Sequence, residues 1–354
     1  MAHDMDRYIR EMVAKNASDL HISAGSPVYL RIDEVLMPAD DNILTAEDSK
    51  AIVYSLLTNE QKEKFERELE LDVSFGVKGL GRFRINVFKQ RGTISSSIRL
   101  IPHEVWSFEK CGLPAATVLD FCKRPKGLVL VTGATGSGKS TSLSSMVDWI
   151  NSNRACHIVT IEDPIEFIYR NKKAVVDQRE VYSDTHSFPA SLKHVLRQDP
   201  DVILIGEMRD LETIESALIV AETGHLVFAT LHTSDCVQTI NRIVDVFPSH
   251  QQQQIRTQLS FVLLGVLSQQ LIPKSGSRGR VLATEVLIVT PAVKSLIRES
   301  KGHQIYSVMQ TSQREGMKTM NQSLYELYRE KLISYEDMFD RTTDPEDLKR
   351  IFKR

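Results

Sequence analysis

An eight-residue segment at positions 133–140 constrains this chain more than any other feature. It reads G-A-T-G-S-G-K-S, follows a short apolar run at 128–131, and precedes a stretch at 140–150 with helical character. A strand, a G-x-x-x-x-G-K-[S/T] loop and a helix in this order form a P-loop, in which glycines let backbone N–H groups face a phosphate chain. The helix N-terminus adds partial positive charge. The segment therefore predicts a nucleoside triphosphate site on an α/β domain.

Roles for individual residues follow from the same pattern. Lys139 is expected to reach the β- and γ-phosphates of ATP, and the hydroxyl of Ser140 to ligate Mg²⁺. ATP and Mg²⁺ are thus the predicted ligand and cofactor. The other residues expected to contact the nucleotide are Thr135, Gly136, Ser137, Gly138 and Thr141.

Short apolar runs recur around the P-loop, separated by helical stretches. They lie at 128–131, 158–161, 202–205 and 226–229. Uninterrupted runs suit parallel strands buried on both faces, so the predicted fold class is α/β with an open, doubly wound sheet. Two further runs, at 271–273 and 281–289, predict a hairpin. The ATPase domain is expected to cover residues 115–290. A mainly helical region at 291–354 follows, opened by Thr290 as N-cap and Pro291.

The first 101 residues predict a separate α+β domain. Apolar residues at helical spacing between positions 5 and 13 indicate an opening helix. Thr45 with Asp48, and Thr58 with Gln61, have the spacing of capping boxes at helix starts. Segments at 28–32, 71–77, 82–88 and 93–101 indicate strands. Residues 102–114, with two prolines and a glycine, predict a linker or hinge.

Carboxylates follow two of the apolar runs. Glu162, Asp163 and Glu166 come after the run at 158–161, and Glu207 ends the run at 202–205. Such strand ends form the ligand-binding edge of an α/β sheet. Glu207 has the position of a Walker B acid, which helps hold Mg²⁺, here through water. The base that activates water is then expected among the three earlier acids, with Glu166 as the best candidate.

Histidines and arginines supply further candidates. His225 and His232 bracket the run that begins at 226, and they could either sense the γ-phosphate or be ordinary structural residues. Exposed strand arginines are usually solvated, but one or two could neutralise phosphate charge in a pocket that closes between two domains. The arginines expected on successive strands of the first domain are Arg82, Arg84, Arg91 and Arg99.

Composition narrows the class of protein. Of 354 residues, 42% are hydrophobic and 25% charged, as in an ordinary globular chain. The formal net charge of -2 disfavours a protein that grips nucleic acid through many phosphates. The N-terminus has no apolar core of signal-peptide length and the run at 259–267 is too short to span a bilayer, so a cytoplasmic protein is expected. The 4 cysteines have no CxxC spacing and are expected to be reduced core residues.

Taken together, four motifs resemble those of the secretion and pilus motor ATPases, and within them the PilT-type retraction ATPases of type IV pili. They read G-A-T-G-S-G-K-S, T-I-E-D-P-I-E, R-Q-D-P-D-V-I-L-I-G-E-M-R-D and T-G-H-L-V-F-A-T-L-H-T. The resemblance spans nearly the whole chain and implies a PAS-like N-terminal domain, a RecA-like ATPase domain and a homohexameric ring. Carried over by residue, it implies the following set: Glu166 as catalytic glutamate, Glu207 as Walker B acid, His225 and His232 as the His-box pair, and Arg84 and Arg99 as phosphate-facing arginines.

The branch of the family is inferred from two further features. Extension and type II secretion ATPases carry an extra N-terminal region and usually a four-cysteine zinc module, which this sequence is not expected to have. Retraction ATPases carry an A-I-R-N-L-I-R-E element, and residues 292–299 read A-V-K-S-L-I-R-E. The change at Lys294 and Ser295 leaves an accessory paralogue of the PilU kind as an alternative to the main motor.

The expected partners follow from the same resemblance. They are an inner-membrane platform protein, the pilus machinery and a paralogous retraction ATPase, with membrane contact made only through these proteins. Two other functions compete with a motor: a scaffold that binds ATP and hardly hydrolyses it, and a RecA-like nucleic-acid translocase. Turnover by the purified protein, with and without DNA or RNA, separates them.

Overall fold

The computed structural model describes residues 5–32, 35–101, 104–276 and 278–352, which form two compact units. The first unit holds the described residues up to Glu104 together with Glu166–Ile168. The second holds Val105–Ile165 and the described residues from Tyr169 on. Positions 102 and 103 of the predicted linker lie outside the described residues. The rest of that segment is not uniformly irregular, because it contains helix α4 (Phe108–Cys111).

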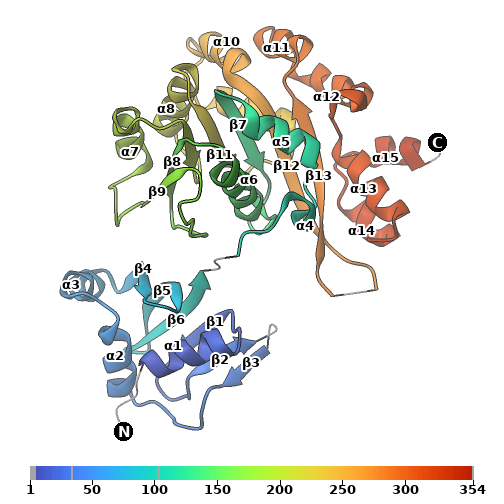
Figure 1. Ribbon diagram of the computed structural model, residues 1–354. Helices are drawn as coiled ribbons and strands as arrows, with labels where there is room; N and C mark the ends of the chain where they lie inside the picture. The colour runs from blue at the N-terminus through green and yellow to red at the C-terminus, as the bar shows by residue number, and fades with distance from the viewer. Residues whose placement is uncertain (1–4, 33–34, 102–103, 277, 353–354) are drawn as a thin grey trace. The chain divides into compact units, whose positions relative to one another are not determined.

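The first unit is built on an antiparallel sheet of order β3-β2-β1-β6-β5-β4 (Figure 1). Its strands are β1 (Asp19–Ile22), β2 (Tyr29–Ile32), β3 (Val35–Pro38), β4 (Glu70–Val77), β5 (Gly81–Gln90) and β6 (Thr93–Ile101). Its helices are α1 (Met5–Ala14), α2 (Ala46–Ser55) and α3 (Asn59–Glu68). Both predicted capping boxes are present, at Thr45 and Thr58. The opening helix and the predicted strands are confirmed, whereas β1 and β3 were not predicted as strands.

Alternation along these strands separates an apolar from a polar face. On β5, Phe83, Ile85 and Val87 are buried in a core shared with α1 and α2. The residues between them, including Arg84, point to the other side, because successive side chains of a strand alternate. Arg91 differs from the prediction: it lies between β5 and β6, in a turn with φ 50°, and not on a strand.

The second unit confirms the predicted α/β class. Its sheet has the order β13-β12-β7-β11-β10-β8-β9, with β13 antiparallel to β12 and the other neighbours parallel. The strands are β7 (Gly127–Thr132), β8 (His157–Glu162), β9 (Val175–Glu180), β10 (Val202–Ile205), β11 (Leu226–Leu231), β12 (Leu263–Pro273) and β13 (Arg280–Ile288). The four predicted parallel strands and the hairpin are present, and β9 is an addition.

Helices cover both faces of this sheet, as a doubly wound fold requires (Figure 1). One face packs in a single core with α7 (Phe188–Val195), α8 (Leu211–Glu222), α9 (Cys236–Asp245) and α10 (Gln252–Val262). On the other side lie α5 (Ala115–Lys123) and α6 (Lys139–Asn153), where a side chain at Gly265 would meet the ring of Phe121 at 2.3 Å. The P-loop strand β7 therefore runs through the middle of the domain, buried along its whole length.

The chain ends in helices that belong to the second unit. They are α11 (Pro291–Arg298), α12 (Gly302–Thr311), α13 (Met320–Arg329), α14 (Tyr335–Asp340) and α15 (Pro345–Phe352). Thr290 caps α11 and Pro291 is its first residue, as predicted. Val293 and Ile297 are buried, so this part of the 292–299 element has a packing role. Within the described ranges, no helix is both long and apolar enough to cross a membrane.

Candidate functional site

The P-loop joins the end of β7 to the start of α6, as the sequence predicted. Lys139 is the first residue of α6 and is buried, with 9% of its surface exposed. Its ammonium donates to the carbonyl oxygens of Gly133 at 2.8 Å and Ala134 at 3.1 Å. A buried cation is thereby held inside the curve of the loop, where it can neutralise a phosphate chain.

The loop offers donors in the way that a phosphate site requires. Gly138 is the N-cap of α6 with φ 91°, and within the described chain no side chain caps this helix start. The first N–H groups of α6 thus remain available to an anion. Gly136 has φ 77°, and a Cβ added there would meet nothing within 4 Å. The buried Ser137 hydroxyl has no partner among the described residues. These features fit the phosphates of a nucleotide.

Strand β12 forms the floor of the loop. A Cβ at Gly133 would lie 2.5 Å from the carbonyl oxygen of Gln269, so the two backbones touch. The Gln269 side chain donates from Nε2 to the Ser142 hydroxyl of α6 at 2.6 Å, and both residues are buried. This contact fixes the helix behind the P-loop to its neighbouring strand. Sequence reasoning missed Gln269, because nothing local marks a glutamine in a strand as a support for a loop far away in the sequence.

Glu207 follows β10, and its carboxylate contacts two basic side chains. His232 Nε2 lies 3.2 Å from Glu207 Oε1, and Arg209 Nη2 lies 2.8 Å from Oε2. Because β11 lies between β7 and β10, His232 at its carboxyl end stands between the P-loop strand and the Glu207 strand. Burial by itself would raise the pKa of Glu207, but Arg209 and His232 outweigh it and lower the pKa. The acid is therefore ionised at neutral pH, as a metal-holding carboxylate must be.

The other acids of the predicted edge differ in burial. Glu162 ends β8, is buried, and accepts from the Thr160 hydroxyl at 2.7 Å and from Gln178 Nε2 at 3.3 Å. Asp163 and Glu166 are exposed, and Glu166 groups with the first unit. The structure therefore brings Glu162 and Glu207 to adjoining strand ends of the second unit, and Glu166 is not part of that sheet edge.

Gly206 explains why a single acid follows β10. Its N–H donates to the carbonyl of Ile161 at 2.8 Å, and a Cβ at this position would lie 3.2 Å from the Cα of Glu162. Contacts of 3.2 Å leave little room, so the Asp found here in many P-loop ATPases would press against β8. Sequence reasoning also missed Arg209 and Gln178. Arg209 could have been found, because it lies only two residues after Glu207. Opposite charges at that spacing in a loop can form an ion pair.

Three predicted residues belong to other parts of the fold. His225 precedes β11, and Gly127 N at the start of β7 donates to its carbonyl, so it lies at the sheet edge opposite the P-loop of its own chain. Its Nδ1 lies 3.1 Å from the carbonyl of Val220. Arg84 and Arg99 belong to the first unit, directly opposite each other on β5 and β6. The sequence left open whether the two histidines belong to the nucleotide site or are ordinary structural residues. In the structure His232 contacts Glu207 of the predicted site, whereas His225 lies at the other end of β11.

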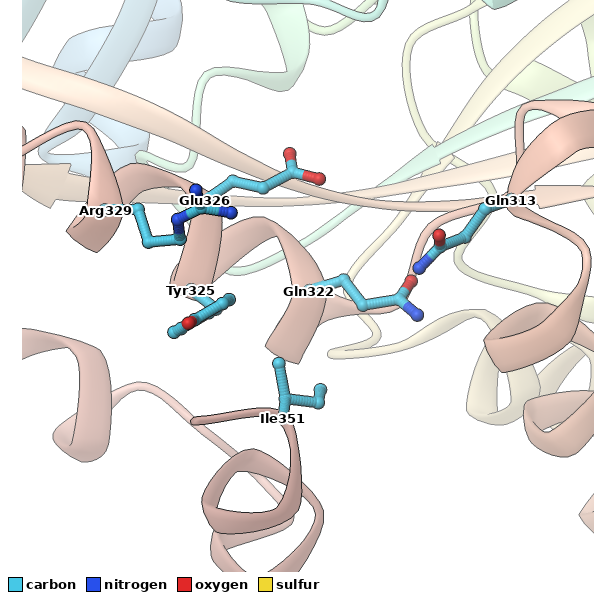
Figure 2. A pocket seen from close by; sticks show the side chains of 6 residues that line it. All are labelled: Gln313, Gln322, Tyr325, Glu326, Arg329 and Ile351. Atoms are coloured by element: carbon cyan, nitrogen blue, oxygen red, sulfur yellow. The ribbon is translucent and has the colours of Figure 1, made fainter. Parts of the chain in front are cut away.

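A separate cavity of about 560 Å³ lies among the C-terminal helices. It is lined by Gln313, Gln322, Tyr325, Glu326, Arg329 and Ile351. Figure 2 shows the side chains of Gln313 and Gln322 converging on one side of it. None of the residues predicted to bind nucleotide lines this cavity. In the described part of the chain, no group of three or more His, Cys, Asp or Glu side chains is placed to hold a metal ion.

Comparison with known proteins gives the family. Residues 1–339 match the family model described as type II/IV secretion system protein. The type IV pilus retraction ATPase PilT of Pseudomonas aeruginosa is 46% identical over 347 residues, which cover 98% of this chain and 100% of that protein. A twitching motility protein of Neisseria gonorrhoeae is 46% identical over 305 residues, covering 86% and 81% of the two chains. The ATPase PilU of P. aeruginosa is 38% identical over 99% and 91%.

Solved structures agree with the sequences. The crystal structure of the pilus retraction motor PilT with bound ADP has a TM-score of 0.91 and 50% identity, covering 97% of this chain and 98% of that one. The ATPase DotB of Legionella pneumophila has a TM-score of 0.78 and 27% identity over 94% of each chain. With a G-x-x-x-x-G-K-S loop, a buried Lys139 and an ionised Glu207 around one sheet, the chain belongs to the type II/IV secretion system protein family, in the branch of the type IV pilus retraction ATPases.

Proposed function

We propose that this chain is a Mg²⁺-dependent ATPase that works as a homohexameric motor in the retraction of type IV pili. The observation that carries this proposal is the P-loop, with buried Lys139 at the start of an uncapped α6. The 46% identity to a retraction ATPase and the 50% identity to a retraction motor with bound ADP support the pilus assignment. The lower identity to PilU, 38%, favours the main motor over the accessory paralogue.

In this proposal the second unit binds and polarises the triphosphate. The backbone of residues 135–141 and the ammonium of Lys139 bind the β- and γ-phosphates. Ser140 and, through water, Glu207 would hold Mg²⁺, which would supply positive charge to the phosphates during hydrolysis. Arg209 and His232 keep Glu207 ionised for this purpose. His232 also lies beside the P-loop strand, so it is suited to sense the γ-phosphate, whereas His225 could act only through another route, such as a neighbouring subunit.

Glu166 is proposed as the general base that orients the attacking water. The T-I-E-D-P-I-E motif of the family supports this assignment, and the side chain of Glu166 is exposed to solvent, whereas that of Glu162 is buried. Glu166→Gln should therefore abolish steady-state turnover while ATP still binds. Glu162→Gln is the matched control, since it makes the same chemical change in a buried supporting acid and should slow turnover less. A Glu166→Gln protein with the rate of the unmodified chain would discard this assignment.

Arg84 and Arg99 are proposed to contribute positive charge to the nucleotide phosphates, from the same chain or from a neighbour in the ring. Closure of the first unit toward bound ATP, and its release after hydrolysis, would then be a ligand-biased hinge that produces movement. The chain is proposed to act in the cytoplasm at the inner membrane, through a platform protein of the pilus machine.

Deletion of the gene tests the direction of the work. Loss of a retraction motor should leave cells with excess surface pili and without twitching, and restoring the gene should reverse both. Cells without pili would instead indicate an extension motor. Turnover by the purified chain separates a motor from a nucleotide-gated scaffold, and the Lys139→Ala protein is the negative control for that assay.

A further inference from the structure

A row of charged side chains crosses the polar face of the first unit's sheet. The strand registers place Asp19 on β1 between Arg31 on β2 and Arg99 on β6. Arg99 is in turn directly opposite Arg84 on β5. Opposite residues of an antiparallel sheet have neighbouring side chains, and like charges in such a pair disfavour the sheet. The Arg84–Arg99 pair therefore needs negative charge nearby, from acids or from a bound anion.

Asp19 is the buried member of this row. Its side chain is 8% exposed, against 70% for Arg99. Arg99 Nε donates to Asp19 Oδ1 at 2.8 Å, and the Ser18 hydroxyl donates to Oδ2 at 2.8 Å. Burial alone would raise the pKa of Asp19, but the hydrogen bonds from Arg99 and Ser18 outweigh it, and the pKa lies below its usual value. The carboxylate is thus charged at neutral pH and held at both oxygens.

The bond to Asp19 occupies Nε of Arg99 and leaves the end of the guanidinium free. Within the described chain, neither terminal nitrogen of Arg99 donates to an acceptor. A guanidinium is a rigid planar fork, so a fixed Nε also fixes the directions of the two terminal nitrogens. The same fork matches two oxygens of a phosphate.

We propose that Asp19 is a positioning residue that holds Arg99 by Nε and keeps its terminal nitrogens oriented for the terminal phosphate of ATP. This inference rests on the proposed function, in which Arg99 faces the phosphates. Asp19 itself touches no nucleotide. Its effect on turnover is therefore exerted entirely through Arg99.

Simple electrostatics predicts the opposite sign, which makes the proposal testable. A carboxylate next to an anion site repels the anion, so removing its charge should strengthen ATP binding. If the orientation of Arg99 matters more than this repulsion, removing the charge of Asp19 should instead lower kcat/KM for ATP.

Asp72 supplies the matched control. Arg84 Nη2 lies 3.6 Å from Asp72 Oδ1, and the two side chains are 41% and 55% exposed. An exposed pair at this distance contributes little to geometry, and it engages a terminal nitrogen instead of Nε. Asp72→Asn removes the same charge from the same sheet without releasing Arg99.

The experiment measures kcat/KM for ATP and the dissociation constant for ADP with the full-length assembly. Asp19→Asn should lower kcat/KM about tenfold, because the ion pair at Nε of Arg99 is replaced by a weaker hydrogen bond to an uncharged amide. Its affinity for ADP, which lacks the terminal phosphate, should stay that of the unmodified chain. Asp72→Asn should change kcat/KM less than about twofold. Arg99→Lys should not retain the activity of the unmodified chain. A single ammonium group cannot bind Asp19 and at the same time present two nitrogens to a phosphate.

A double-variant cycle isolates the pathway. In an Arg99→Ala background, Asp19→Asn should have no further effect on kcat/KM, and additive losses would overturn the proposal. The proposal would also be overturned if Asp19→Asn left kcat/KM unchanged or raised it while Arg99→Ala lowered it. In that case the proposed role of Arg99 would still stand. If Arg99→Ala itself hydrolyses ATP normally, the phosphate-facing assignment of the proposed function fails first. If Asp19→Asn weakens ADP binding about as much as it lowers kcat/KM, and also lowers the melting temperature, the substitution has damaged the fold in general. That outcome would refute a positioning role.

Discussion

Replacing Gly133 by alanine should disable the P-loop through its backbone. Gly133 has φ 140°, a conformation that residues with a side chain rarely adopt. A Cβ there would meet the Gln269 carbonyl oxygen at 2.5 Å and the Ser137 hydroxyl at 2.6 Å. Ser137 can rotate, but the Gln269 carbonyl belongs to a strand paired on both sides. The loop must therefore move, and with it the carbonyl that holds Lys139.

The magnitude follows from these two contributions. The backbone conformation costs about 1–3 kcal/mol for a residue with a side chain. Forcing a methyl group into the contact with β12 costs about 1–3 kcal/mol more. A total near 4 kcal/mol corresponds to roughly a thousandfold loss of nucleotide affinity, if the whole cost falls on the binding conformation.

Gly136→Ala is the matched control in the same loop. Its φ of 77° also favours glycine, but nothing lies within 4 Å of the added methyl group. The left-handed conformation alone costs about 1–2 kcal/mol, or roughly a tenfold loss. Titration with a fluorescent ATP analogue compares the two proteins with the unmodified chain. Tenfold or weaker loss in Gly133→Ala, or a larger loss in Gly136→Ala, would refute this account of the loop.

Three further predictions concern the second unit. Burial raises the pKa of Glu285, which accepts from the N–H groups at the starts of α9 and α13. A folded-state pKa above the unfolded one adds stability as pH falls, so the melting temperature of the natural chain relative to Glu285→Gln should rise between pH 7 and 5. Cys122 is buried and its pKa is raised by burial to about 12, so iodoacetamide at pH 8 should modify it more slowly in native protein than the partly exposed Cys156, whose pKa burial also raises, as mass spectrometry can show. Asp347 accepts hydrogen bonds from three side chains of α12 and α13, and Asp347→Ala should cost about 2–4 kcal/mol and speed proteolysis of the last helix.

Local signals were sufficient wherever a short segment carries its own physical cause. Thr45 and Thr58 cap helices with residues three positions away, and Thr290-Pro291 starts a helix through the same neighbours. Strands β7, β8, β10 and β11 are buried on both faces, which leaves continuous apolar runs in the sequence. Strand β3 left no such signal, since all four of its residues are exposed at the edge of the sheet.

The roles of Lys139, Ser140 and Glu207 in binding nucleotide and metal stay predictions. Sequence pattern alone was enough to predict the fold class and the strand–loop–helix order around Lys139 and Ser140, because a phosphate-binding turn needs those residue types at fixed spacing. It could not determine which distant side chains meet. Strand order decided that, by inserting β11 between β7 and β10 so that His232 contacts Glu207 and His225 faces the opposite edge. Register decided it again in the first unit, where Asp19 contacts Arg99 across 80 positions of sequence. Contacts of this kind depend on how separate strands pair, and no local pattern contains that information.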